Sequence, residues 1–232
     1  MLPLLRSTVI EPRISFLCMT RADRVNAKIV ATLRALGCGL MAIGVETGDA
    51  DLAKQPWVGR ARPEHGEIRR ATVVIRQGGI HCRWYLQVGM GQQDWASIEK
   101  TIRFYFGIED HERLTIDSIR SAMLGVRRNW IPDSINVATN IPYPGTVIER
   151  FYRDRVWVKP EYRDSYERMR HEPEIGFRDK IFADPITETE VMSSADIGEA
   201  REITLKLHSF GVDHKWEEVS WLISRLSSHV ET

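Results

Sequence analysis

The stretch LMAIGVETG, Leu40–Gly48, sets the fold that the rest of the sequence follows. Its first part, Leu40–Val45, is an apolar run too short for a helix, and the polar turn Glu46–Gly48 ends it. The run therefore predicts a buried strand that breaks into polar and glycine residues at its carboxyl end. The same break follows three other apolar runs, at Thr20–Asp23, Gly89–Gly91 and Thr139–Asn140.

Helical patterns separate these runs. Apolar residues recur at helical spacing over 25–36, and Pro63 opens a second helix that Gly78 and Gly79 end. Asp94 and Thr115 are suited to cap two more helices. Strands are expected over 13–19, 40–45, 81–88 and 134–140. Strands that alternate with helices predict a parallel sheet.

The fold class expected is therefore α/β. From about residue 150 the alternation fades, which predicts two parts, 1–150 and 151–232. The second part is expected to be an extended arm over 155–192 followed by helices over 194–210 and 215–228.

Composition narrows the function. The chain has 232 residues, and its 32 basic residues balance its 32 acidic ones, so no net charge attracts nucleic acid or an anionic membrane. No apolar stretch approaches the roughly 18 residues of a membrane span, and Met1–Arg6 is too short for a secretory signal. A cytoplasmic protein is expected. The cysteines Cys18, Cys38 and Cys82 lie far apart, which predicts neither a disulfide framework nor a metal site.

Chemistry is expected where the strands end, because the carboxyl ends of parallel strands share one edge. Arg21 offers a planar donor fork for a carboxylate, or else a salt bridge to Asp23 or Glu46. Glu46 is suited to accept hydrogen bonds from a ribose diol or to bind an ammonium group, or it is a plain helix-cap acid. Gly89 and Gly91 let a planar ring approach the backbone, although a tight turn explains them equally well.

The seven histidines are scattered without the spacing of a helical zinc pair, and no serine-hydrolase or P-loop motif occurs. No metal ligands are expected in this chain.

Read together, the strand ends resemble the radical S-adenosylmethionine (radical SAM) superfamily. Thr20–Asp23, Leu36–Cys38 and Ile43–Gly48 are similar to the run T-R-x-D, A-G-C and G-x-E-S-G of the subgroup that carries a cobalamin-binding domain. Ile80–Gly91 looks like the family's fifth strand, and Pro132–Asn136 with Pro142–Thr146 looks like its sixth strand and P-Y-P-G-T loop. The resemblance covers about residues 13–150.

The resemblance implies the later strands of a partial TIM-like (β/α) barrel with a C-terminal helical extension. It implies S-adenosylmethionine as a cofactor, held by Arg21 and Glu46 at its methionine or ribose part. Gln87, Gly89 and Gly91 would lie along the adenine. The substrate, a small molecule, would be bordered by a loop made of Pro142, Tyr143, Pro144, Gly145 and Thr146.

The family's chemistry is reductive cleavage of the sulfonium by a [4Fe–4S] cluster, which gives a 5′-deoxyadenosyl radical. Members that use cobalamin often transfer a methyl group or rearrange a carbon skeleton.

Two departures separate this chain from the family pattern. The C-x-x-x-C-x-x-C loop that holds the cluster is absent, and the three distant cysteines do not replace it. The expected P-G-E is Gly91-Gln92-Gln93, which loses the acid. The chain is therefore expected to be incomplete alone, and to need a partner chain or a preceding segment to complete the barrel.

Three readings follow from these patterns. The first is part of a radical SAM enzyme, and the second is a non-catalytic remnant that serves as a binding or partner module. The third is an unrelated barrel enzyme that uses Asp23, Glu46 and Asp94 as acids and bases.

Overall fold

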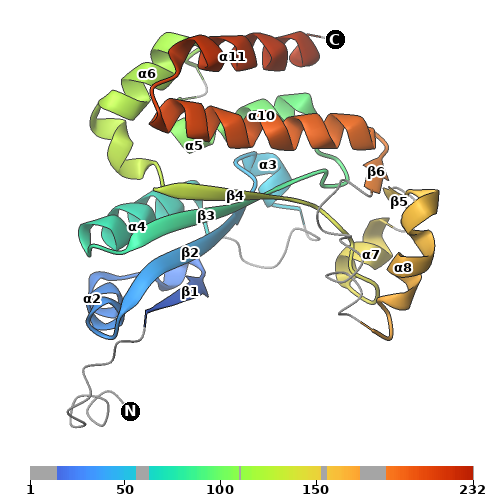
Figure 1. Cartoon of the computed structure of the whole chain (residues 1–232), viewed down its shortest axis with the longest axis horizontal. Coiled ribbons are helices and arrows are strands. Elements are labelled where there is room, and N and C mark those ends of the chain that lie inside the picture. Colours follow the sequence, from blue (N-terminus) through green and yellow to red (C-terminus); the bar gives the residue numbers. More distant parts are fainter. Residues whose placement is uncertain (1–14, 56–62, 110, 153–155, 173–186, 232) are drawn as a thin grey trace.

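The computed structural model describes residues 15–55, 63–109, 111–152, 156–172 and 187–231. Within them four parallel strands form a sheet in chain order, β1 (Phe16–Thr20), β2 (Cys38–Glu46), β3 (His81–Val88) and β4 (Ser134–Thr139). Figure 1 shows the sheet rising from β1, in blue, to β4, with all carboxyl ends on the side of α7 and α8. The predicted α/β fold with parallel strands is confirmed.

The sequential strand order decides which face of the sheet is covered. Right-handed crossovers between neighbours taken in order place every connecting helix on the same face, as in an arc of a (β/α) barrel. The connections contain α2 (Ala27–Ala35), α3 (Ala50–Ala53), α4 (His65–Gln77), α5 (Trp95–Phe106) and α6 (Ile116–Leu124), with short 3-10 turns at Ala22–Arg24 and Val126–Trp130. The opposite face, called here the open face, is left without crossover helices.

Burial along β3 separates the two faces. Cys82, Trp84, Leu86 and Val88 are buried, and they alternate with the half-buried residues of the open face. Trp84 lies at the centre of the covered side, where its ring stacks on Phe104 and its Nε1 donates to Thr72 Oγ1 at 2.8 Å. The open face carries Arg83, Tyr85 and Gln87 of β3 beside Ser134, Asn136 and Ala138 of β4.

The helices start where local capping chemistry places them. Asp94 accepts a hydrogen bond from Ser97 N at 2.7 Å at the start of α5, and Thr115 forms a capping box at the start of α6. Both caps were predicted and are confirmed. The predicted strand starts at residues 13 and 14 lie outside the described residues, and β1 is described from Phe16.

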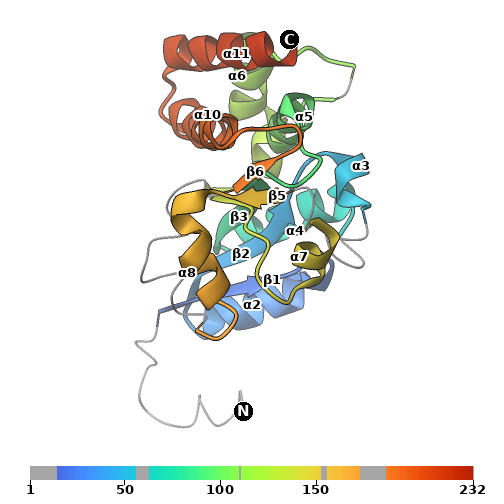
Figure 2. The ribbon, with the colours of Figure 1, turned by 90° about the vertical axis from the view of Figure 1, so that its right-hand side faces the viewer.

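The last part of the chain covers the β4 edge. Helix α10 (Ser194–Val212) lies along β4, and α11 (Trp216–Val230) packs on α10 (Figure 2). Arg201 Nε donates to Val137 O at 2.8 Å, which satisfies a carbonyl of β4. Apolar residues of both helices belong to the same core cluster as the sheet.

The segment 155–192 differs from the extended arm that its composition predicted. Its described residues form β5 (Val156–Val158), a 3-10 turn at Pro160–Tyr162, α8 (Arg163–Arg168) and β6 (Thr187–Thr189). β5 pairs antiparallel with β6, and the short α7 (Val147–Tyr152) precedes them. The Tyr166 hydroxyl donates to Pro142 O, and Thr187 Oγ1 donates to Asn140 O, so both contacts fasten this segment to the exit of β4.

Among the described helices, none is both long and apolar enough to cross a membrane.

A paired glycine substitution tests how α10 is seated. A Cβ on Gly89, which has φ +76°, would lie 2.9 Å from Ile197 of α10, whereas a Cβ on Gly66 meets nothing within 4 Å. Gly89→Ala is expected to lower the free energy of unfolding by about 2 kcal/mol through overpacking and left-handed strain. Gly66→Ala, in an exposed turn of α4, is expected to raise it by roughly 0.5 kcal/mol. Urea denaturation measures both, and equal effects would contradict the packing described.

Candidate functional site

The candidate site is the carboxyl edge of the sheet, and the turn after β2 is its centre. Between Gly44 and Glu46 the pairing of β2 with β3 shifts by one residue, so that Val45 forms a bulge. Glu46 then adopts a left-handed backbone with φ 65°. A non-glycine residue in this region is strained by about 1–2 kcal/mol, and such strain gathers at functional sites.

The Glu46 carboxylate lies on the open face. Gly44 pairs with Tyr85, so a side chain at Gly44 would point to the open face. A Cβ built there would lie only 2.9 Å from Glu46 Oε1. The carboxylate therefore lies over Gly44 on the open face, in the space that the missing side chain leaves.

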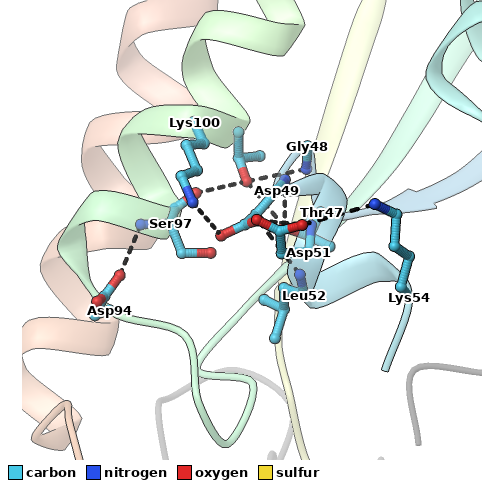
Figure 3. Close-up of polar contacts among 10 residues, drawn as sticks. Thr47, Gly48, Asp49, Asp51, Leu52, Lys54, Asp94, Ser97 and Lys100 are labelled. Carbon is cyan, nitrogen blue, oxygen red and sulfur yellow. Dashed lines mark hydrogen bonds and ion pairs between the residues drawn. The ribbon is translucent and has the colours of Figure 1, made fainter. Parts of the chain in front are cut away.

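The residues after Glu46 fasten this turn to α5 (Figure 3). Thr47 Oγ1 lies 3.1 Å from Thr101 Oγ1 in the interior, and Gly48 N donates to Thr101 Oγ1 at 3.0 Å. A Cβ on Gly48 would lie 2.6 Å from Phe104 Cβ and 2.8 Å from Thr101 Cα, so only glycine lets the turn approach α5 this closely.

Asp49 completes the fastening. Its Oδ1 accepts hydrogen bonds from the backbone of Asp51 and Leu52 at the start of α3, and its Oδ2 lies 3.4 Å from Lys100 Nζ (Figure 3). Burial raises the pKa of Asp49, but the hydrogen bonds from the backbone of Leu52 and Asp51 and the charge of Lys100 outweigh it and lower the pKa overall. Asp49 is therefore charged at neutral pH and holds the turn rather than a proton for catalysis.

Arg21 lies at the end of β1, at the same edge of the sheet. Its Nε and NH2 donate to the two carboxylate oxygens of Asp23, each at 3.0 Å. Hydrogen bonds from Arg21 lower the pKa of Asp23. The salt bridge to Asp23, one of the alternatives predicted for Arg21, is formed.

The turn after β3 holds Gly89 and Gly91, both buried. The position beside Gly89 that a planar ring was predicted to use is filled by the Ile197 side chain. Gln93 stands where the family pattern has an acid. Its side chain is fully buried and forms two hydrogen bonds with the backbone of β3 and of the turn. Its Nε2 donates to Gln87 O and its Oε1 accepts from Met90 N, both at 3.4 Å. An ionised glutamate cannot donate a hydrogen bond to Gln87 O, which explains why an amide stands at this position.

The loop Pro142–Thr146 forms the cap of α7. Thr146 Oγ1 donates to Tyr143 O at 2.6 Å, and Gly145 N donates to Glu149 Oε2 at 2.8 Å. Arg170 NH2 holds the second oxygen of Glu149 at 2.6 Å. The Tyr143 side chain is exposed.

The edge thus brings together Arg21, Glu46, Gln87 and Gly89, because they follow or end neighbouring parallel strands. Gln87 is on the open face with Tyr85 and Asn136, two polar residues that the sequence analysis did not single out. Their alternation with buried neighbours along β3 and β4 was the signal available in the sequence.

The described residues do not fit an iron–sulfur cluster. Cys18 Sγ and Cys38 Sγ lie 3.8 Å apart, and Cys38 and Cys82 are buried in the core. Burial raises the pKa of Cys82 to about 12, and burial together with the Cys38 hydrogen bond raises the pKa of Cys18 to about 11. Cluster ligands must be thiolates, and these environments oppose the thiolate. Nowhere in the described ranges do three His, Cys, Asp or Glu side chains gather as a metal site.

Comparison with known proteins shows a structural likeness but no match in sequence. No family model and no curated protein matches the chain. Among solved structures, the chain is similar to coproporphyrinogen III oxidase from Escherichia coli, which is described as a radical SAM enzyme. The TM-score is 0.44 and the identity 11%, over 87% of this chain and 32% of that one. The chain spans about a third of the length of that enzyme. Because the identity and the TM-score are low, the function of this chain is inferred from its own residues.

Thiol chemistry tests the environment of the cysteines. At pH 8 the native chain is expected to react slowly with a disulfide reagent at Cys38 and Cys82, because burial suppresses the thiolate, whereas the urea-unfolded chain exposes all three cysteines. Anaerobic reconstitution with iron and sulfide is expected to leave no stable cluster absorbance after desalting. Stoichiometric iron retained by the native chain would contradict the assignment of these cysteines to the core.

Proposed function

We propose that this chain carries the S-adenosylmethionine-binding part of a radical SAM fold, with Glu46 as its principal polar contact. The observation that carries the proposal is the Glu46 carboxylate, held over Gly44 by a left-handed backbone at the carboxyl edge of the sheet. In the run G-x-E-T-G, Gly44–Gly48, packing or hydrogen bonding explains Gly44, Thr47 and Gly48, and this supports the resemblance.

The open face of the sheet is suited to the ligand that the resemblance implies. A carboxylate accepts two hydrogen bonds from a ribose diol or pairs with the ammonium of a methionine group. Tyr85, Gln87 and Asn136 extend this polar surface along β3 and β4. Arg21 is a cation at the same edge of the sheet. Its guanidinium, which donates to Asp23, would also bind a ligand carboxylate.

The chain's own groups would bind and orient the ligand in this proposal. Glu46 would fix the ribose or the amino group, and the backbone of Gln87 and Gly91 would lie along the adenine, since Ile197 fills the position beside Gly89. The loop Pro142–Thr146 would border a small-molecule substrate. A [4Fe–4S] cluster held by a partner chain or a preceding segment would supply the electron that this chemistry needs.

Completion of the barrel is part of the same proposal. Within the described residues β1 is an edge of the sheet, and its Leu17 and Met19 are each 62% exposed on the open face. A strand from a partner chain or from a preceding segment would cover them and could bring the cluster ligands. The cobalamin link rests on the motif run alone.

The acid–base alternative, which used Asp23, Glu46 and Asp94, gains no support from Asp23 or Asp94. Asp23 is bonded to Arg21, and Asp94 caps α5, so both carboxylates already have structural partners.

Calorimetric titration of the full chain with S-adenosylmethionine tests the proposal. Saturable binding is expected, and Glu46→Gln is expected to weaken it about tenfold, because one charge-assisted hydrogen-bonding group is lost. Gly44→Ala is expected to weaken binding with native circular dichroism, since its Cβ takes the space beside Glu46 Oε1.

Glu217→Gln, an exposed acid on α11, is the matched control and is expected to bind as the parent does. No binding at millimolar ligand would exclude the proposal, and so would equal binding by the Glu46→Gln variant.

A further inference from the structure

A cavity lies away from the Glu46 carboxylate, between the turn after β2 and helices α4 and α5. Its volume is about 300 Å³, and its walls include Asp49, Arg69, Lys100, Phe104 and Glu109. Glu46 does not line it. Pockets for small ligands begin at about this size, so the cavity suits a compact molecule.

Arg69 of α4 is the most constrained charged group in this wall. Its guanidinium lies over the rings of Phe104 and Trp130, with Cζ 5.3 Å and 5.2 Å from their centroids. These two contacts restrict the position of the guanidinium. Among the described residues its buried Nε has no hydrogen-bond partner, and its NH1 is 3.6 Å from Glu109 Oε1, an ion pair longer than a hydrogen bond.

This leaves a planar donor fork that is held in place and only partly used. A fork of this kind matches the two oxygens of a carboxylate. The Arg69 Nε is buried out of reach of the cavity, so a ligand carboxylate would meet the terminal nitrogens of the fork.

The charges of the cavity indicate what else the ligand carries. Its walls hold the carboxylates of Asp49, Asp51 and Glu109 against the cations Arg69 and Lys100. A bare anion would meet more negative than positive charge. The Glu109 carboxylate instead lies beside the Arg69 guanidinium. Such a pair of opposite charges complements a ligand that carries a carboxylate and an adjacent ammonium group.

We propose that this cavity binds a free α-amino acid. Arg69 holds its carboxylate in the plane of the fork, and Glu109 accepts from its ammonium group. Phe104 and Ile108 supply the apolar part of the lining beside the side chain.

Calorimetry of the full chain with the standard L-amino acids, one at a time, tests this site. Saturable binding is expected for at least one of them. Its N-acetyl derivative lacks the ammonium group, its amide lacks the carboxylate, and inorganic phosphate is a bare anion; each is expected to bind about tenfold more weakly or less. Phosphate or the N-acetyl derivative binding as tightly as the amino acid would overturn the proposal in favour of an anion site. The absence of saturable binding by any amino acid would also overturn it.

Two variants locate the site. Arg69→Lys keeps the charge but loses the fork, and Glu109→Gln removes the half-exposed acid; each is expected to weaken binding about tenfold. Arg24→Lys, whose side chain is 77% exposed and lies beside Asp23, is the matched control and is expected to change nothing. Circular dichroism checks folding, and Glu109→Gln decides alone if Arg69→Lys does not fold. Parent-like binding by the folded variants would overturn the proposal.

S-adenosylmethionine itself carries an α-amino acid group, so the two sites need separate readouts. Glu46→Gln is expected to leave amino-acid binding unchanged, and Arg69→Lys is expected to leave S-adenosylmethionine binding unchanged. Loss of amino-acid binding in Glu46→Gln would place that ligand at the sheet edge and overturn the assignment to the cavity.

Discussion

The hydroxyl groups of Thr47 and Thr101 meet 3.1 Å apart in the interior, and the geometry of the sheet edge depends on this contact. Thr101 also accepts from Gly48 N, so one side chain of α5 holds two consecutive residues of the turn after β2. Gly48 lies against the backbone of α5 with no room for a Cβ. The turn therefore cannot relax outward, and Glu46 immediately before it is kept in its left-handed conformation. Free energy from buried contacts thus maintains a strained residue at the surface of the site.

Much of the fold follows from local chemistry that the sequence displays. The strand over His81–Val88 has the predicted bounds, and Asp94 and Thr115 cap the helices they were predicted to cap. These features depend on a few neighbouring residues, through alternation and hydrogen bonds to the first turn of a helix. The described residues of 155–192 form short strands and α8 that composition did not predict, because contacts with distant residues hold them, such as that of Tyr166 with Pro142.

The site was predictable in its place but not in its geometry. Parallel strands put Arg21, Glu46 and Gln87 at one edge, which periodicity alone could predict. The bulge at Val45 could not be predicted, because Gly44–Glu46 reads equally well as continuous strand. The packing role of Gly89 depends on Ile197, which arrives from α10 more than a hundred residues later in the chain. The cavity at Arg69 likewise needs rings from α5 and from the turn before β4.

The central claim is that the backbone at Glu46 is strained in order to place its carboxylate on the open face. The free energy of unfolding of Glu46→Gly, measured by urea denaturation, tests it most directly. Glycine adopts φ 65° without strain but loses more entropy on folding, so stability should stay equal or rise by up to about 1 kcal/mol. A fall of about 2 kcal/mol or more would identify Glu46 as a residue that the fold needs for stability, and it would contradict a carboxylate held there for a ligand.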